Sequence, residues 1–373
     1  MTTTAAHDAA TDGRFMAAAL RLSRRNEGRT AENPAVGCLI VRDGAIVGRG
    51  ATAPSGRPHA ERVALDEAGE AARGATAYVT LEPCAHHGRT QPCADALVEA
   101  GVAHVVIGAA DPDPRVAGRG AATLRAAGID VTEDVLAAEC RRQMAPFLSR
   151  VERGRPHVLL KLAVSPDGFL GRADEPNVAI TGPIARAQTH LMRARCDAIL
   201  VGAGTVRIDD PALTVRLPGL GDRSPLRIVL SNGHDLSPDA EVVRTAHERP
   251  TVVMSTRPAV PDDVDRSDAL RAANPAIRLR AVAGPDHPPG SLEPMLHDLA
   301  MDGIGALMVE GGAAVARSFL DAELVDEIAL FAGARPLGHG VASPLPPDHV
   351  PPGFVPERED RFGEDRLFTF WRR

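Results

Sequence analysis

One stretch of the sequence carries the residue types of a hydrolytic zinc site. His59, Cys84 and Cys93 offer an imidazole and two thiols, and Glu61 offers a carboxylate two positions after the histidine. Zinc in catalytic sites takes three protein ligands and keeps a fourth position for water, whereas structural zinc is closed by four ligands. The three residues therefore predict a catalytic zinc site, in which Glu61 is free to transfer protons.

The order of these residues matches a signature of known chemistry, with one difference. His-x-Glu followed by Pro-Cys-x-x-Cys marks zinc-dependent nucleobase deaminases. Here Cys93 lies nine positions after Cys84, where the signature has three. The insert contains His86 and His87, either of which could close the site as a fourth ligand. A structural zinc site, or no metal at all, is thus the alternative to a catalytic one.

The flanking sequence predicts that these side chains lie at the ends of regular elements. A helical run over residues 60–68 follows a proline, which places His59 and Glu61 in its first turn. An apolar strand over residues 75–81 leads to Cys84, which is expected to open a helix or a tight turn. A helix N-terminus and a bound metal both favour the thiolate over the thiol.

Composition and charge limit the class of protein. The chain has 373 residues, of which 44% are apolar and 3% aromatic, so it can fill two or three aliphatic cores. A formal net charge of -7 without a basic run argues against nucleic acid as a partner. Five cysteines, an odd number, fit a reduced cytoplasmic setting. No apolar run approaches membrane-spanning length, so a membrane is not expected as a partner either.

The order of predicted elements divides the chain into two α/β domains. We expect a disordered tail over residues 1–12, a first domain over 13–150, a linker over 151–156 and a second domain over 157–373. Helices are predicted over residues 14–24, 60–68, 94–100, 121–127, 135–147, 183–195 and 313–320. Strands are predicted over residues 38–41, 46–47, 75–81, 102–107, 129–131, 158–164, 198–201, 226–230, 251–254, 277–279, 307–309, 327–331 and 367–371.

Several polar or small residues follow or precede these strands, where α/β proteins bind ligands. Asp111 and Asp113 come after one strand of the first domain, and Asn33 comes before another; each could equally be an ordinary turn residue. In the second domain, a small-residue loop over 202–205 follows a strand. Paired glycines at 311–312 precede a helix N-terminus, which can hold an anion. Neither stretch is the G-x-G-x-x-G dinucleotide signature.

Residues 78–93, with Asn33-Pro34-Ala35-Val36-Gly37 and Asp111-Pro112-Asp113-Pro114, resemble the bifunctional deaminase–reductases of riboflavin biosynthesis, the RibD type. Residues 191–194, 198–202 and 209–214 resemble the reductase domain of that family. The resemblance spans nearly the whole chain after the tail. It implies an α/β protein in which an N-terminal cytidine-deaminase-like three-layer domain precedes a dihydrofolate-reductase-like α/β domain, and it implies a homo-oligomer.

The resemblance also implies two consecutive reactions on a phosphorylated pyrimidine. Zn2+ would serve the hydrolytic deamination of 2,5-diamino-6-ribosylamino-4(3H)-pyrimidinone 5′-phosphate, and NADPH would then reduce the ribosyl group to ribityl. By position, the zinc ligands are His59, Cys84 and Cys93, the catalytic residue is Glu61, and the pyrimidine site is Asn33, His86, Arg89, Asp111 and Asp113. The NADPH positions are Ala163, Ala179, Thr205, Asp209, Gly312, Ala313, Ala314, Val315, Ala316, Arg317 and Ser318. The substrate positions of the reductase are Asn177, Arg193, Leu213, Arg216 and Glu310.

Some residues depart from the family pattern. Asp113 stands where the family usually has Asn, and Asn177 and Ala179 stand where it usually has Ser and Trp. These last two positions contact substrate and cofactor in the family. A deaminase whose second domain only binds a ligand or mediates assembly therefore remains an alternative, as does a relative that acts on another pyrimidine. The zinc-site residues would also fit a nucleic-acid base editor or a non-enzymatic zinc scaffold.

Overall fold

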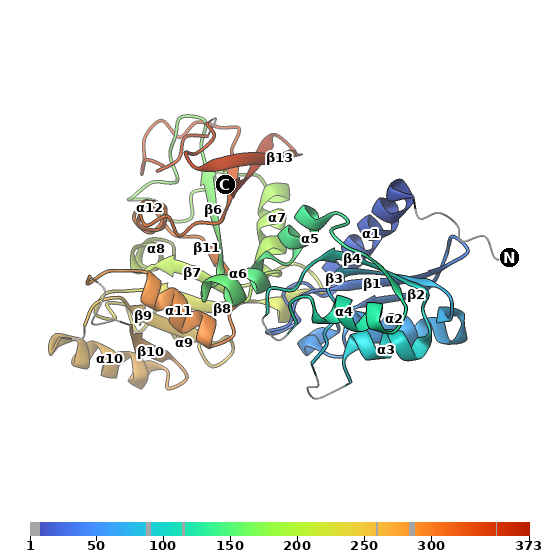
Figure 1. The fold of residues 1–373 in the computed structure, drawn as a ribbon. Coiled ribbons are helices and arrows are strands. Elements are labelled where there is room, and N and C mark those ends of the chain that lie inside the picture. Colours follow the sequence, from blue (N-terminus) through green and yellow to red (C-terminus); the bar gives the residue numbers. More distant parts are fainter. Residues whose placement is uncertain (1–7, 87–90, 114–115, 259, 283–287, 348) are drawn as a thin grey trace. The chain divides into compact units, whose positions relative to one another are not determined.

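The computed structural model describes residues 8–86, 91–113, 116–258, 260–282, 288–347 and 349–373. The chain folds into two compact units, the first ending at Gly154 and the second beginning at Arg155 (Figure 1). Each unit has one sheet and its own apolar core. Across the described ranges, every helix is too short or too polar to span a bilayer.

The first unit is built on a five-stranded sheet of order β2-β1-β3-β4-β5. Strands β2, β1 and β3 pair antiparallel, and β3, β4 and β5 pair parallel. The strands are β1 (Gly37–Arg42), β2 (Ala45–Ala51), β3 (Thr76–Leu81), β4 (His104–Ala109) and β5 (Asp130–Thr132). The helices are α1 (Ala9–Ser23), α2 (Ala60–Ala68), α3 (Cys93–Ala100), α4 (Arg119–Ala126), α5 (Ala137–Gln143) and α6 (Ala145–Arg153).

Close-packed glycines show that α1 and α2 cover opposite faces of this sheet. A Cβ atom on Gly37 would lie 2.1 Å from the carbonyl oxygen of Ala19 in α1. Gly50 pairs with the next residue of β1, Cys38, and a Cβ atom there would lie 1.8 Å from the carbonyl oxygen of Ala60 in α2. Because successive residues of a strand point to opposite faces, the sheet lies between two helical layers. Figure 1 shows α2, α3 and α4 grouped on one of these faces. The predicted three-layer architecture is confirmed.

The second unit is built on a nine-stranded sheet of order β10-β9-β8-β7-β11-β6-β12-β14-β13. The pairs from β10 to β12 are parallel, and β14 and β13 add an antiparallel edge. The strands are β6 (His157–Val164), β7 (Ala198–Gly202), β8 (Leu226–Leu230), β9 (Thr251–Ser255), β10 (Arg278–Ala281), β11 (Ala306–Val309), β12 (Glu327–Ala332), β13 (Phe354–Phe362) and β14 (Asp365–Arg372). The helices are α7 (Pro183–Arg193), α8 (Ala203–Asp209), α9 (Glu241–Arg244), α10 (Asp262–Ala273), α11 (Glu293–Met301) and α12 (Ala313–Asp321).

The N-terminal helix begins earlier than the sequence predicted. Residues 9–12, assigned to a disordered tail, form the first turn of α1, because the Asp8 carboxylate caps the helix by accepting from the backbone N–H of Ala10 at 2.9 Å. Asp12 is buried and accepts a hydrogen bond from the hydroxyl of Tyr78 at 2.9 Å, which fixes α1 to β3. Residues 1–7 lie outside the described part of the chain.

Two further predictions of secondary structure were wrong. The single helix expected over residues 135–147 is two helices, α5 and α6, because Pro146 cannot continue a helix from the preceding turn and instead lies at the start of α6. Helix α6 also extends to Arg153, so the first residues of the predicted linker are helical. The small-residue loop expected over 202–205 is mostly the first turn of α8.

The packing of α2 on β2 predicts the effect of one substitution. Gly50→Ala should push α2 away from the sheet, because the added methyl group overlaps the backbone of α2. We expect a loss of about 1–3 kcal/mol in the free energy of unfolding of the first unit, as for other overpacked cores. Urea denaturation measures it. Gly13→Ala in α1 is the matched control, since a Cβ atom there meets nothing within 4 Å; equal losses in both variants would contradict the prediction.

Candidate functional site

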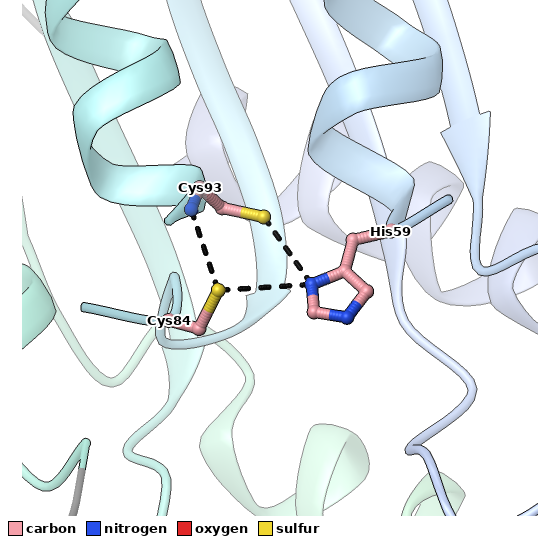
Figure 2. A group of neighbouring side chains, drawn as sticks. All are labelled: His59, Cys84 and Cys93. Atoms are coloured by element: carbon pink, nitrogen blue, oxygen red, sulfur yellow. Dashed lines mark hydrogen bonds between the residues drawn. The ribbon is translucent and has the colours of Figure 1, made fainter. Parts of the chain in front are cut away.

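The structure brings the three predicted metal ligands of the first unit together. The Nδ1 atom of His59 lies 3.7 Å from the Sγ atom of Cys84 and 3.3 Å from that of Cys93 (Figure 2). All three donor atoms lie within 4.8 Å of one another. The cluster that the described residues form does not include His86, and His87 lies outside the described part of the chain.

Two helix N-termini and one strand end position these ligands. His59 is the residue before α2, and Cys93 is the first residue of α3. Cys84 follows β3 in an irregular segment and does not open a helix, contrary to one of the two expectations for it. The N-terminus of α3 holds Cys84 instead: the backbone N–H of Cys93 donates to its Sγ atom at 3.3 Å, and that of Ala94 donates to its carbonyl at 3.2 Å.

The donor set fits zinc. Tetrahedral zinc with bonds of about 2.3 Å to sulfur and about 2.0 Å to nitrogen requires its ligand atoms to lie about 3.5 Å apart, close to the separations of 3.7 and 3.3 Å seen here. Two sulfurs and one imidazole nitrogen favour zinc, whereas magnesium and calcium bind oxygen ligands. Three protein donors also match a catalytic site, which needs a position for water.

The electrostatics of the cluster favour a thiolate beside a protonatable carboxyl. The pKa of Cys84 falls to about 4, mainly because its sulfur accepts a hydrogen bond from the Cys93 side chain. Burial acts in the opposite direction, and a hydrogen bond with His59 lowers the pKa further. The hydrogen bond between the two cysteines raises the pKa of Cys93. Burial, together with the charge of Cys84, raises the pKa of Glu61 to about 7. Glu61 is 4% exposed and lies in the first turn of α2, as predicted. A carboxyl group poised near neutrality is suited to accept and return a proton.

Glu82, directly before the Pro83-Cys84 pair, is a site residue that the sequence analysis did not single out. It is 4% exposed. Its carboxylate accepts hydrogen bonds from the backbone N–H groups of Asp111 (3.4 Å), Gly118 (3.0 Å), Gly120 (2.9 Å) and Ala121 (3.2 Å). One buried anion thus ties the end of β3, which carries a metal ligand, to the segment after β4. The sequence did contain a signal for this residue, namely a glutamate directly after the apolar strand over residues 75–81.

The described residues of the predicted pyrimidine site lie in three segments of the first unit. Asn33 packs against Gly56, where a Cβ atom would lie 2.1 Å from the Asn33 side-chain nitrogen. Asp111 is buried, which raises its pKa to about 6, and its carboxylate accepts from the backbone N–H of Asp113 at 2.9 Å. His86 is half-buried, and its Nδ1 atom is buried without a hydrogen-bond partner in the described structure. Arg89 lies outside the described residues.

The second unit contains a cavity of about 730 Å³ at the ends of β6, β7 and β11. Glycines and the N-terminal turns of α8 and α12 form one side, and residues 170–181 form another. The backbone N–H of Gly312 donates to the hydroxyl of Thr205 at 3.2 Å, which joins the two helix N-termini. The predicted residues that line the cavity are Ala163, Asn177, Ala179, Thr205, Asp209, Glu310, Gly312, Ala313, Ala314, Val315 and Arg317.

Other predicted residues do not line this cavity. The side chains of Ala316 and Leu213 are buried in apolar cores. Ser318 is exposed, and its hydroxyl donates to the carbonyl of Ala314 within α12. Arg193 and Arg216 are not part of its wall, and Arg193 is connected to it through Glu310. The helical periodicity of α12 explains why only part of the predicted run 312–318 faces the cavity.

A buried ionic group at the cavity includes a lysine that the sequence analysis missed. Arg193 donates to both carboxylate oxygens of Glu310, at 2.6 and 2.9 Å, and the Lys161 ammonium lies 3.8 Å from the same carboxylate. These two cations hold the pKa of Glu310 at about 2 despite its burial. Burial lowers the pKa of Lys161. A lysine in the middle of the apolar run 158–164 was the signal that could have identified it.

Comparison with known proteins accounts for both units. The RibD C-terminal domain model matches residues 156–352, and the model of the cytidine and deoxycytidylate deaminase zinc-binding region matches residues 9–109. The riboflavin biosynthesis protein RibD of Escherichia coli K12 is 41% identical over 340 residues, which is 88% of this chain and 89% of that protein. The chain belongs to the RibD family. RibD of Haemophilus influenzae is 39% identical over 339 residues, 87% of this chain and 86% of that protein.

Solved structures of RibD proteins have the same fold. Acinetobacter baumannii RibD, 32% identical, covers 98% of this chain and 100% of its own with a TM-score of 0.82. The Thermotoga maritima diaminohydroxyphosphoribosylaminopyrimidine deaminase/5-amino-6-(5-phosphoribosylamino)uracil reductase, 34% identical, covers the same shares with a TM-score of 0.83. The predicted order of a deaminase domain and a RibD reductase domain is therefore confirmed, and with it a bifunctional deaminase–reductase of riboflavin biosynthesis.

The contacts of Glu82 predict how its replacement affects the RibD deaminase unit. Glu82→Gln exchanges one acceptor oxygen for an amide that faces backbone N–H donors, leaving at least one of them buried and unpaired. We expect the unfolding free energy of the first unit to fall by about 1–3 kcal/mol, and ammonia release to slow. Glu70→Gln, at an exposed residue, is the control. Stability and turnover equal to those of the control would show that the four hydrogen bonds are unimportant.

Proposed function

We propose that this RibD protein first deaminates 2,5-diamino-6-ribosylamino-4(3H)-pyrimidinone 5′-phosphate with zinc and then reduces the ribosyl group of the product with NADPH. The observation that carries the proposal is the convergence of His59, Cys84 and Cys93 beside the buried Glu61, in a chain that also has the reductase cavity. Further support comes from the Thermotoga maritima relative, whose name combines a pyrimidine deaminase with a uracil reductase.

In the deaminase unit, His59, Cys84 and Cys93 would hold the zinc ion. Zinc held there would lower the pKa of a coordinated water and so supply the nucleophile for the amino-bearing carbon. Glu61 would move the two water protons in turn, the first to the ring nitrogen beside the reacting carbon and the second, from the new hydroxyl, to the departing amine, so the C–NH2 bond is replaced by C=O and ammonia leaves. The burial of Glu61 favours its protonated form, which makes the second proton transfer easier.

Four residues are available to orient the pyrimidine beside this centre. Asn33 provides an amide held in place by Gly56, and His86 has a buried ring nitrogen without a partner in the described structure. The backbone N–H of Asp111 donates to the carboxylate of Glu82, two residues before the metal ligand Cys84, at 3.4 Å. Asp113 fixes the orientation of Asp111 through its backbone N–H group. A carboxyl and an amide are suitable partners for the ring N–H and exocyclic groups of a diaminopyrimidinone.

In the reductase unit, the cavity wall has the features of a dinucleotide site. Backbone N–H groups at the N-terminus of α12 and the guanidinium of Arg317 can receive a diphosphate. NADPH held in this cavity would supply the hydride for C1′ of the ring-opened ribosyl group. Reduction also requires one proton for the former ring oxygen. Lys161, in the same wall and paired with Glu310, can donate it.

The two reactions can be separated in one experiment with the full chain. We expect zinc-loaded protein to release ammonia from the diamino substrate and then to oxidise one NADPH per ammonia. Removing zinc with a chelator should abolish ammonia release but leave NADPH oxidation intact on the deaminated compound, because the cavity residues include none of the zinc ligands. Ammonia release without NADPH oxidation would favour a second unit that only binds ligand or mediates assembly.

The role of Glu61 predicts a selective loss. Glu61→Gln keeps the size of the side chain but cannot accept a proton, so ammonia release should fall by about 10²–10⁴-fold. Zinc content, measured by atomic emission, should stay at the level of the unmodified chain, because Glu61 is not in the ligand cluster. NADPH oxidation on the deaminated compound serves as the internal control. Undiminished ammonia release would refute the proton-transfer role.

A further inference from the structure

Two residues of α7 hold the backbone of the segment that follows α8. The Nδ1 atom of His190 accepts a hydrogen bond from the backbone N–H of Arg216 at 3.4 Å. One turn later, the Nη1 atom of Arg193 donates to the carbonyl oxygen of Thr214 at 3.1 Å. Because positions three apart lie on the same face of a helix, His190 and Arg193 contact residues 214–216 from a single side. These two hydrogen bonds fix the backbone from which the Arg216 side chain extends.

Of the two arginines near His190, one is paired with a carboxylate and the other, within the described part of the chain, is not. Arg193 is neutralised by its two hydrogen bonds with Glu310, and Lys161 also lies near that carboxylate. Arg216, by contrast, is exposed, and its guanidinium has no hydrogen bond or ion pair with any residue that the structure describes. An uncompensated cation therefore stands next to His190, close to the ionic group that borders the cavity.

His190 is prepared to act as a hydrogen-bond donor. Because its Nδ1 atom accepts from Arg216, the ring proton belongs on Nε2. Burial lowers the pKa of His190, and the neighbouring Arg193 and Arg216 cations lower it further, against smaller opposite effects of Glu310 and the Thr214 backbone. The ring is thus neutral in the free protein. The Nε2–H group can donate to an anion beside Arg216 while Nδ1 keeps its bond with the backbone.

We propose that His190 is a phosphate-recognition residue of the reductase site, where it acts with Arg216 to bind the 5′-phosphate of the ribosyl substrate. This rests on the proposed function. A phosphate monoester carries a charge of about −1.5 to −2 at neutral pH. The Arg216 guanidinium and the Nε2–H donor of the neutral His190 suit such a group, whereas Arg193 is already paired with Glu310. The affinity gained in this way depends on the phosphate and not on the pyrimidine.

A comparison of phosphorylated and dephosphorylated substrates distinguishes phosphate recognition by His190 from a purely structural role. His190→Asn keeps an acceptor near the position of Nδ1, so it can still hold the Arg216 N–H, but it lacks the Nε2 donor. We expect the KM for the deaminated 5′-phosphate to rise about tenfold or more, as for the loss of a hydrogen bond to a charged group, with kcat changed less than about threefold. The kcat/KM for the dephosphorylated substrate should stay within about twofold. His297→Asn, at an exposed residue of α11, is the matched control.

A binding measurement keeps the outcome independent of turnover. Calorimetry with ribose 5-phosphate and with ribose should show that His190→Asn weakens only the phosphate ester, by about tenfold, while NADPH affinity is unchanged and reports an intact fold. Equal losses for phosphorylated and dephosphorylated ligands, or no loss for either, would overturn the proposal. If the unmodified chain reduces neither substrate, the proposed function fails; the ribose 5-phosphate comparison then still decides the role of His190.

Discussion

His59, Cys84 and Cys93 are spread over 34 positions of the sequence, yet their donor atoms must meet with the spacing that a tetrahedral ion requires. Much of the packing in the first unit keeps them in place. His59 and Cys93 each lie at a helix N-terminus, where backbone N–H groups and the helix dipole stabilise negative charge. The two helices can approach closely because α2 rests on glycines of β2. Close packing of backbone against backbone leaves few degrees of freedom, so His59 keeps its position without a capping side chain.

Both units use buried or well-bonded carboxylates to fix the segments that surround a site. In the first unit, Glu82 gathers four backbone N–H groups beside a metal ligand. In the second, Asp167 accepts from the hydroxyl of Ser165 and from the backbone N–H groups of Leu337 and Gly338. These hydrogen bonds lower its pKa and hold the segments that contain these residues together. Loops cannot satisfy their own backbone donors as helices and strands do. An anion that accepts several of them is an effective way to give a loop one conformation.

The sequence predicted the parts of the structure that depend on local pattern. Helix α2, strand β8 and the three metal ligands follow from periodicity, from glycine and proline signals and from motif spacing. It missed β13, because an edge strand with charged, exposed residues has no apolar alternation to detect. It also missed Lys161 and Glu82. Their importance comes from partners more than 28 positions away, which only the tertiary fold brings into contact.

The unusual residues of the second unit are compatible with a formed site. Asn177 has a φ of 55°, a left-handed conformation that asparagine tolerates better than most residues. In that conformation its backbone N–H donates to the Asp209 carboxylate at 2.8 Å, and its side-chain amide donates to the Asp209 carbonyl at 3.1 Å. The segment across the cavity is therefore attached to the end of α8 at two points. Ala179 contributes a small side chain to the cavity wall. Burying the Lys161, Glu310 and Arg193 charges costs free energy, which the two hydrogen bonds from Arg193 to Glu310 and the nearby Lys161 ammonium offset, so the charged group stays ordered at the edge of the cavity.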